Sequence, residues 1–263
     1  MIMGVINVTP DSFSDGGDYL DPGAAVDHAR RLITQGAGII DVGAESTRPG
    51  STGISAADEW RRLEPLLKRL QQARLGVPIS VDTCKEDIML RALDAGADWI
   101  NDTSGKASLA TLARFATYRQ MSYIAMHMPW TPDIMQTTPL GPGPALAAVA
   151  TFFAHRHQTA LEAGLEPTQI WLDPGIGFGK TDAANVQAMA AVKTWAKTYQ
   201  IAVGVSRKSL LGRTLGIDAP KQRDAPSKTL ELGLVMLGAR LIRTHSVLPL
   251  KRLLDLLGEG VHV

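Results

Sequence analysis

Short apolar runs alternate with longer amphipathic stretches along the whole chain. Eight runs recur, each ending at a cluster of polar residues, and they span 2–7, 38–43, 78–82, 98–102, 123–127, 170–173, 202–205 and 241–245. Nearly continuous apolar runs of this length are typical of parallel strands that helices cover. Eight strand–helix units in about 250 residues are typical of a (β/α)8 barrel. We therefore expect an α/β fold with a single domain, a TIM barrel over residues 1–263.

The stretches between the runs carry helix signals at their ends. Pro22 follows Asp21, which suits the start of a helix, and Ser55 to Asp58 resembles a capping box. The helix after Ser55 has one apolar face, and Pro65 inside it predicts a kink or a late start. Further helices are expected over 22–36, 85–95, 109–118, 145–163, 183–198, 227–237 and 248–257.

The polar residues at the strand ends predict an enzyme, because the active site of a TIM barrel lies at the carboxyl ends of its strands. Three connections on that side are long and rich in Gly and Pro, namely 8–21, 44–55 and 128–144. Loops of this length usually bind or cover a ligand. We expect the first two to be mobile without ligand and to become ordered when substrate binds.

Composition narrows the class of protein. The formal net charge is +1, which offers no overall field for nucleic acid or a membrane surface. No apolar run is long enough to cross a membrane, and no cleavable leader is evident near Met1, so a cytoplasmic protein is expected. The single cysteine, Cys84, excludes an internal disulfide. It lies just past the third strand, where a small structural residue is favoured over a reactive thiol.

Basic and hydroxyl side chains follow the last two strands. These are Ser206, Arg207, Lys208 and Ser209 after the seventh strand, and Arg243, Thr244 and His245 at the end of the eighth. The loops after these strands commonly hold phosphate in TIM barrels, and charge-assisted hydrogen bonds suit phosphate or pyrophosphate. Arg48 and Lys180 add to the positive charge expected on this rim.

The opposite side of the rim offers carboxylates and an amide, from Asp82, Asn101 and Asp173. Such groups suit either the donor and acceptor edge of a heterocycle or a metal ion, although no pair of residues has the spacing of metal ligands. The segment 173–180, DPGIGFGK, matches neither nucleotide-binding glycine motif. Its glycines are expected to permit a tight turn and a close approach to a ligand.

Taken together, these motifs resemble the dihydropteroate synthase family of the folate pathway over almost the whole chain. The matching segments are GVINVTPDSFSDGG (4–17), ESTRPG (45–50), SVDT (80–83), IND (100–102), AMHM (125–128), LDPGIGFGK (172–180), GVSRKSLLG (204–212) and IRTH (242–245). The resemblance implies a transferase that condenses 6-hydroxymethyl-7,8-dihydropterin pyrophosphate with p-aminobenzoate, with Mg²⁺, to give 7,8-dihydropteroate and pyrophosphate. It also implies a homodimer, and sulfonamides as competitors of p-aminobenzoate.

The resemblance assigns roles residue by residue. The pterin edge would be hydrogen-bonded by Asp82, Asn101, Asp173 and Lys208. The pocket would be walled by Met126, Phe178 and Gly204, with Arg243 stacked on the ring. Pyrophosphate would be held by Asn7, Arg243 and His245, and Asn7 would also be a Mg²⁺ ligand. The p-aminobenzoate site would be formed by Thr47, Arg48, Phe178, Ser206 and Lys208. The catalytic residues would be Asp173, Lys208, Arg243 and His245.

Some positions depart from the family pattern and leave alternatives open. Pro129 and Trp130 alter the loop beside the pterin entrance, and Ser246 stands where an aspartate is common. A drug-insensitive enzyme is therefore an alternative to a sulfonamide-sensitive one. A pterin-binding methyltransferase on a similar barrel and an inactive folate-binding protein are the rival functions. His127, next to a ligand position, is expected to be structural.

Overall fold

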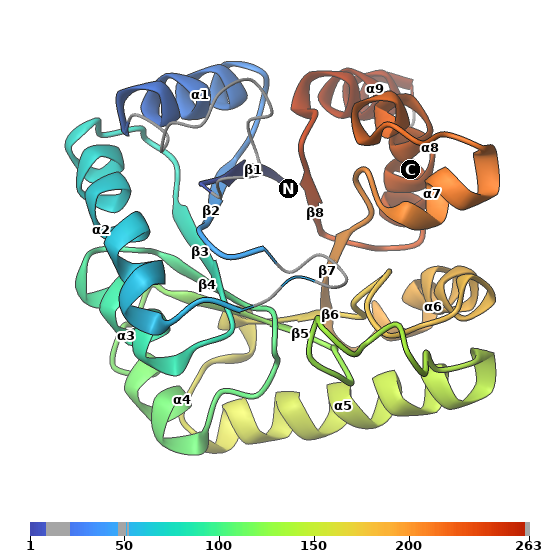
Figure 1. Ribbon diagram of the computed structural model, residues 1–263, viewed down its shortest axis with the longest axis horizontal. Coiled ribbons are helices and arrows are strands. Elements are labelled where there is room, and N and C mark those ends of the chain that lie inside the picture. Colours follow the sequence, from blue (N-terminus) through green and yellow to red (C-terminus); the bar gives the residue numbers. More distant parts are fainter. Residues whose placement is uncertain (9–21, 47–50, 52, 261–263) are drawn as a thin grey trace.

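The computed structural model describes residues 1–8, 22–46, 51 and 53–260, and it is a closed parallel barrel (Figure 1). The strands follow one another in chain order around the barrel, and β8 closes on β1. They are β1 Ile2–Asn7, β2 Ile39–Gly43, β3 Ile79–Thr83, β4 Trp99–Asp102, β5 Ser122–Met126, β6 Ile170–Asp173, β7 Gln200–Gly204 and β8 Leu241–Thr244. The predicted (β/α)8 fold is confirmed.

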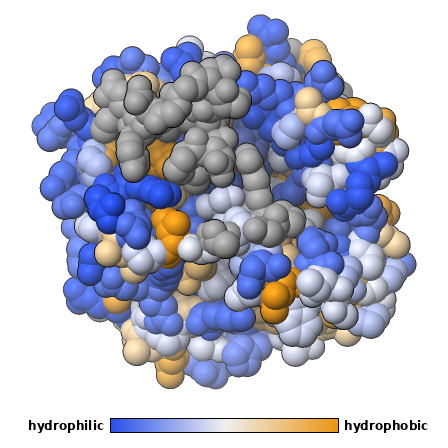
Figure 2. Space-filling view, viewed as in Figure 1, coloured by the Kyte–Doolittle hydropathy of each residue, from blue (hydrophilic) through white to orange (hydrophobic). Residues whose placement is uncertain are grey.

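A ring of helices surrounds the barrel (Figure 1). They are α1 Pro22–Thr34, α2 Ala56–Gln72, α3 Glu86–Asp94, α4 Leu109–Phe115, α5 Pro142–Glu162, α6 Asp182–Trp195, α7 Ser209–Leu215, α8 Asp224–Met236 and α9 Val247–Gly260, with short 3-10 turns η2 Pro167–Gln169 and η3 Pro220–Arg223. None of the helices in the described part of the chain is both long and apolar enough to cross a membrane. On the face seen in Figure 2, hydrophilic residues predominate over the outer helices, as expected for elements that are apolar only toward the sheet.

The helix signals were correct in most places and incomplete in two. Ser55 caps α2 through its hydroxyl, which accepts the backbone N–H of Asp58 at 3.1 Å. The late start suggested by Pro65 is wrong, because α2 begins at Ala56 and continues through that proline. The short helix α7 was not predicted, and α5 begins at Pro142, three residues before the expected start. A proline is well tolerated in the first turn of a helix, where its missing N–H would have no partner.

The barrel has two hydrophobic layers. The larger lies between the strands and the surrounding helices. The smaller lies inside the barrel and consists of Met3, Ile39, Trp99, Ile124, Trp171, Ala202 and Leu241. The rings of Trp99 and Trp171 meet with their centroids 5.3 Å apart and fill much of this space.

The alternation of strand side chains connects this inner layer to the barrel mouth. Successive residues of a strand point to opposite faces, so residues i and i+2 share one face. Asn101 therefore follows Trp99 on the inner face, and Asp173 follows Trp171. By the same rule Arg243 lies above Leu241. The side chains that fill the barrel support those that line its mouth.

Candidate active site

Strand register brings the predicted residues of different strands to one level at the barrel mouth. Asp82 is the register partner of Asn101, and Asp173 is that of Met126. Gly204 is paired with Arg243 across β7 and β8. Asp82, Asn101 and Asp173 are all at most 8% exposed. The barrel thus gathers a buried polar cluster from strands that are far apart in the sequence.

Arg243 links two carboxylates across the mouth. Its Nε donates to Asp41 Oδ2 at 2.6 Å, and its Nη2 donates to Asp82 Oδ2 at 2.7 Å. Burial raises the pKa of Asp82 to about 7, and the charge of Arg243 opposes this rise. Burial lowers the pKa of Arg243, but Asp41 and Asp82 more than offset this and raise it above its usual value. The guanidinium is therefore a fixed positive charge.

Asp41 is a residue of the mouth that no sequence motif identified. Its side chain is fully buried, and its Oδ1 has no hydrogen-bond partner in the described part of the molecule. Asn101 Nδ2 lies 3.5 Å from its other oxygen, which also accepts Arg243. Asp41 lies two residues after Ile39 in β2, so the alternation of side chains places it on the inner face of the barrel. This alternation is the signal in the sequence that could have identified Asp41.

Asp173 and Lys208 form a second charged pair of the mouth. Asp173 Oδ1 accepts the backbone N–H of Gly175 at 2.7 Å, which fixes its carboxylate at the end of β6. Burial raises the pKa of Asp173, and Lys208 is among the charges that oppose the rise. Burial lowers the pKa of Lys208 to about 8, with Asp173 opposing. The Lys208 ammonium lies 3.8 Å from the centroid of the Phe178 ring, a cation–π contact.

The glycine-rich segment after β6 is a turn packed tightly on the protein. Gly175 has φ +64°, and a Cβ there would lie 2.0 Å from the carbonyl oxygen of His127. A Cβ on Gly177 would lie 3.1 Å from the Lys208 side chain. The tight turn is confirmed, and the close neighbours of these two glycines are protein atoms.

Two of the cations expected on the rim are bound by other groups of the protein. Lys180 is only 2% exposed, and its ammonium donates to the carbonyl oxygens of His127, Gly175 and Phe178 at 3.0–3.3 Å. Arg207 makes a bidentate pair with Asp224 at 2.6 and 2.8 Å. Both lie near the rim, since Lys180 acts on Asp173 and Arg207 acts on His245, but both are held by protein partners. Lys180 holds the turn after β6, because carbonyl groups that face inward there need a donor, and Arg207 anchors the start of α8.

Ser206 and His245 meet where the loops after β7 and β8 converge. Ser206 Oγ accepts the backbone N–H of His245 at 3.2 Å and lies 3.1 Å from its Nδ1. Burial lowers the pKa of His245 to about 3, and the nearby charges of Arg243 and Arg207 act in the same direction. At neutral pH this imidazole is uncharged, so it would meet an anion as a neutral hydrogen-bond donor.

Asn7 lies at the end of β1, beside Gly43 in the strand register. A Cβ on Gly43 would lie 3.3 Å from Asp82 Cβ and 3.7 Å from Asn7 Oδ1, so the glycine leaves room between these two side chains. No group of three His, Cys, Asp or Glu residues suited to a metal ion occurs within the described ranges. Mg²⁺ usually keeps several waters and uses substrate phosphates with one or two protein oxygens. The donors present therefore fit Mg²⁺ bound mainly through a phosphorylated substrate.

The loops after β1 and β2 are only partly described. Thr47 and Arg48 lie outside the described residues. So does most of the two loops that we expect to become ordered when substrate binds, and this expectation stays a prediction. At the base of the second loop, Lys85 donates to Glu45 and to Glu59, both at 2.7 Å. Cys84 is beside this group, and burial and Glu45 raise the pKa of its thiol to about 12. The structural interpretation of Cys84 is therefore supported.

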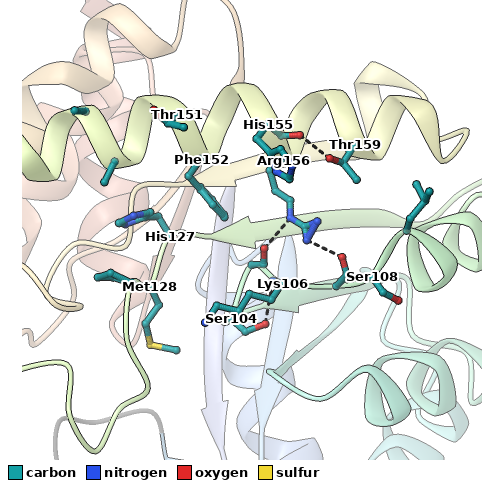
Figure 3. Close-up of a pocket in the computed structure, with 16 residues that line it drawn as sticks. Ser104, Lys106, Ser108, His127, Met128, Thr151, Phe152, His155, Arg156 and Thr159 are labelled. Carbon is teal, nitrogen blue, oxygen red and sulfur yellow. Dashed lines mark hydrogen bonds between the residues drawn. The ribbon is translucent and has the colours of Figure 1, made fainter.

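Met126 joins Met128, Met135 and Phe178 in a small apolar cluster beside the mouth. His127 points the other way, packing its ring 5.3 Å from that of Phe152 on α5. Burial lowers the pKa of His127 to about 3, which agrees with a structural role. A cavity of about 850 Å³ lies on this outer side, between α5 and the loop after β4 (Figure 3). Arg156 is among its lining residues and donates to the carbonyl oxygens of Gly105 and Ala107.

Comparison with known proteins shows the family of the chain. Residues 3–245 match the family of pterin binding enzymes. The dihydropteroate synthase of Neisseria meningitidis serogroup C is 39% identical over 250 residues, 94% of this chain and 87% of that protein. That of Bacillus subtilis strain 168 is 35% identical over 268 residues, 100% of this chain and 90% of that protein.

Solved structures extend the comparison. Xanthomonas albilineans dihydropteroate synthase with 4-aminobenzoic acid superposes with a TM-score of 0.89 at 37% identity, covering 100% of this chain and 93% of that one. The Anaplasma phagocytophilum enzyme with bound 6-hydroxymethylpterin-monophosphate gives a TM-score of 0.87 at 30% identity, covering 99% and 98%. The chain belongs to the dihydropteroate synthases, within the family of pterin-binding enzymes. The predicted family is confirmed, whereas the roles carried over to single residues stay predictions.

Proposed function

We propose that this transferase condenses 6-hydroxymethyl-7,8-dihydropterin pyrophosphate with p-aminobenzoate, by departure of pyrophosphate followed by attack of the arylamine. The observation that carries the proposal is the joint arrangement of Asp82, Asn101 and Asp173 at the mouth with Lys208 and His245 in the loops beside them. The first group offers a buried polar edge for a flat heterocycle. The second offers donors for an anion.

In the first step the bond between the pterin methylene carbon and the pyrophosphate oxygen breaks, and the electron pair leaves with pyrophosphate. The cation that remains is delocalised over the electron-rich dihydropterin. Asp173 supports this proposal because its carboxylate is buried and fixed by Gly175, so it is oriented before charge develops. Asp82 and Asn101 would form hydrogen bonds with the donors and acceptors on the edge of the pterin ring.

In the second step the amine nitrogen of p-aminobenzoate forms a bond to the methylene carbon. The resulting arylammonium is strongly acidic, so its proton is released without a dedicated base. The protein must then supply orientation and exclusion of water. Lys208 on the Phe178 ring would border this site, with Ser206, Thr47 and Arg48 assigned to it by family resemblance.

We propose Mg²⁺ as the cofactor, with Asn7 as its protein ligand. When bound with the pterin substrate, Mg²⁺ would neutralise part of the pyrophosphate charge. Asn7 would orient the pyrophosphate end of the substrate beside Gly43, where the absence of a side chain leaves space. Arg243 and His245 would donate hydrogen bonds to the same group, although in the free enzyme Arg243 is held by Asp41 and Asp82.

Release of pyrophosphate from the pterin substrate, measured with and without p-aminobenzoate, tests the function. A dihydropteroate synthase releases one pyrophosphate for each dihydropteroate formed, and the sustained rate requires p-aminobenzoate. Binding of the pterin without turnover would indicate an inactive folate-binding protein. Methyl transfer from a methylated folate, without any use of pyrophosphate, would indicate the methyltransferase.

Three finer points extend the proposal. A homodimer and a cytoplasmic location are proposed from the family resemblance. Sulfonamides are proposed to compete with p-aminobenzoate, by analogy with the Yersinia pestis dihydropteroate synthase, whose structure contains a sulfonamide drug complex. Inhibition measured at several p-aminobenzoate concentrations distinguishes a competitive, sensitive enzyme from an insensitive one.

A further inference from the structure

A buried hydrogen-bond network lies directly behind the Ser206–His245 pair. Lys228 and Glu231 come from α8, where they are 5% and 0% exposed, and their charged groups meet at 2.7 Å. Both reach Thr244, the last residue of β8, which is fully buried. Lys228 Nζ lies 2.6 Å and Glu231 Oε1 lies 2.9 Å from Thr244 Oγ1. None of these three contacts has a role in the reaction described above.

The chemistry of the partners fixes the direction of each hydrogen bond at Thr244. An ammonium group only donates and an ionised carboxylate only accepts. The Thr244 hydroxyl proton therefore points to Glu231, and one oxygen lone pair accepts Lys228. The backbone N–H of Ser246, at 3.4 Å, occupies the other lone pair. Thr244 then has neither a proton nor a lone pair left for Ser206, whose Oγ is 3.4 Å away.

The saturation of Thr244 determines which group accepts the hydroxyl proton of Ser206. Ser206 Oγ already accepts the backbone N–H of His245, and the residue is 8% exposed. Its own proton needs an acceptor, because an unsatisfied buried donor is costly. The remaining acceptor among the contacts of this hydroxyl is His245 Nδ1 at 3.1 Å. Nδ1 can accept that proton only when it carries none itself, so the proton of the neutral ring is on Nε2.

We infer that Lys228, Glu231 and Thr244 are positioning residues that hold His245 as its Nε2–H tautomer. They do so by saturating Thr244, which leaves the Ser206 hydroxyl no acceptor but Nδ1 among the residues that the structure describes. His245 then offers Nε2–H as a neutral donor to the anion. The use of this donor on pyrophosphate rests on the proposed function, whereas the tautomer itself does not.

Nitrogen NMR of the protein labelled with ¹⁵N-histidine tests the tautomer in the absence of substrate. The chain has six histidines, and the signal of His245 is assigned by its loss in His245→Gln. We expect a pyridine-type Nδ1 and a pyrrole-type Nε2 for His245 at pH 7. Protonated Nδ1 in the wild-type protein would overturn the inference, whatever the enzyme is later found to catalyse.

Two variants test the cause of the tautomer. Lys228→Met with Glu231→Leu removes both charges together, which avoids leaving one buried charge unpaired. Thr244 is then free to pair with Ser206, so the His245 signal should change to a mixture of tautomers. Adding Thr244→Val to this double variant removes the competing hydroxyl and should restore the single Nε2–H form. A merely structural role of the network would not predict this restoration.

The enzymatic readout follows the same pattern. The double variant should raise KM for the pterin pyrophosphate by the inverse of the fraction of His245 that keeps Nε2–H, about twofold for an even mixture, with a smaller change in kcat. Leu234→Ala on α8 is the matched control, since it creates a cavity in the core without touching the network. It should lower Tm and leave the His245 spectrum and KM unchanged. An unchanged tautomer in a folded double variant would refute the role of Lys228 and Glu231.

Discussion

Asp173→Asn separates the charge of this residue from its shape. Asp173 Oδ1 accepts the backbone N–H of Gly175 at 2.7 Å, and the amide oxygen of asparagine can accept the same bond. The turn after β6 should therefore persist, and the main change is the loss of a buried negative charge near the reacting ring. Oriented groups of this kind contribute about 2.7–4 kcal/mol to the transition state. We expect kcat to fall by about 10²–10³-fold.

Loss of the buried Asp173 charge should not lower the free energy of unfolding. Burial raises the pKa of Asp173, so its ionised form lowers the stability of the folded state above the ordinary aspartate pKa of about 3.9. Asp173→Asn removes that penalty at pH 7. The gain should disappear as the pH falls through the ordinary value, where the acid is neutral in both states. Thermal unfolding of the two proteins at pH 7 and at lower pH measures this difference.

Pyrophosphate release at saturating concentrations of both substrates gives kcat for this variant. Asp98→Asn is a matched control, because Asp98 also accepts a backbone N–H, that of Ile79 at 2.8 Å, but lies before β4 at the other end of the barrel. The control should retain normal turnover. If Asp173→Asn turned over within threefold of the wild type, the proposed stabilisation of the pterin cation by Asp173 would be wrong.

Other residues give further predictions. Because burial lowers the pKa of Lys208 to about 8, kcat/KM should fall as the pH rises through about 8, and Lys208→Arg should remove this decline in a pH–rate profile. Arg243→Ala should weaken pterin pyrophosphate binding in calorimetry far more than p-aminobenzoate binding to the preloaded enzyme, whereas equal losses would contradict the division of the site. Arg243→Ala should also lower the free energy of unfolding, measured in urea, by about 3–5 kcal/mol, because Asp41 and Asp82 lose their counter-charge. Cys84, whose pKa is raised to about 12, should react with a thiol reagent at pH 7 more slowly than a free cysteine, because little thiolate is present, and a rate equal to that of a free cysteine would refute this.

The fold was predictable because its signals are local and repeated. Each strand is a short apolar run that ends at polar residues, and parallel neighbours bring those ends to one side. The buried polar cluster of Asp82, Asn101 and Asp173 at the mouth was predictable for the same reason, because all three residues lie at strand ends. α7 was missed because it is only seven residues long and directly follows a motif that was interpreted as a loop.

The details of the site depended on partners that no local pattern reveals. Lys180 follows the glycine-rich motif like a phosphate ligand, yet three inward carbonyl groups hold its ammonium. Asp41 lies inside an apolar run and was not singled out, although period-two alternation from Ile39 places it at the mouth. Lys228 and Glu231 lie in a segment predicted only as a helix, and their importance depends on contact with Thr244.

The charges at the mouth indicate which end of the substrate each part of the site suits. Asp41, Asp82 and Asp173 face Lys208 and Arg243 within the same cluster of mutual interactions. Lys180 also acts on Asp173, so with all of these groups ionised three negative charges meet three positive ones and the cluster is formally neutral. The sign of the local charge therefore depends on position within the mouth. We expect the ring, which becomes positively charged as pyrophosphate leaves, beside the carboxylates of Asp82 and Asp173, and the pyrophosphate at the side formed by Asn7, Arg243 and His245.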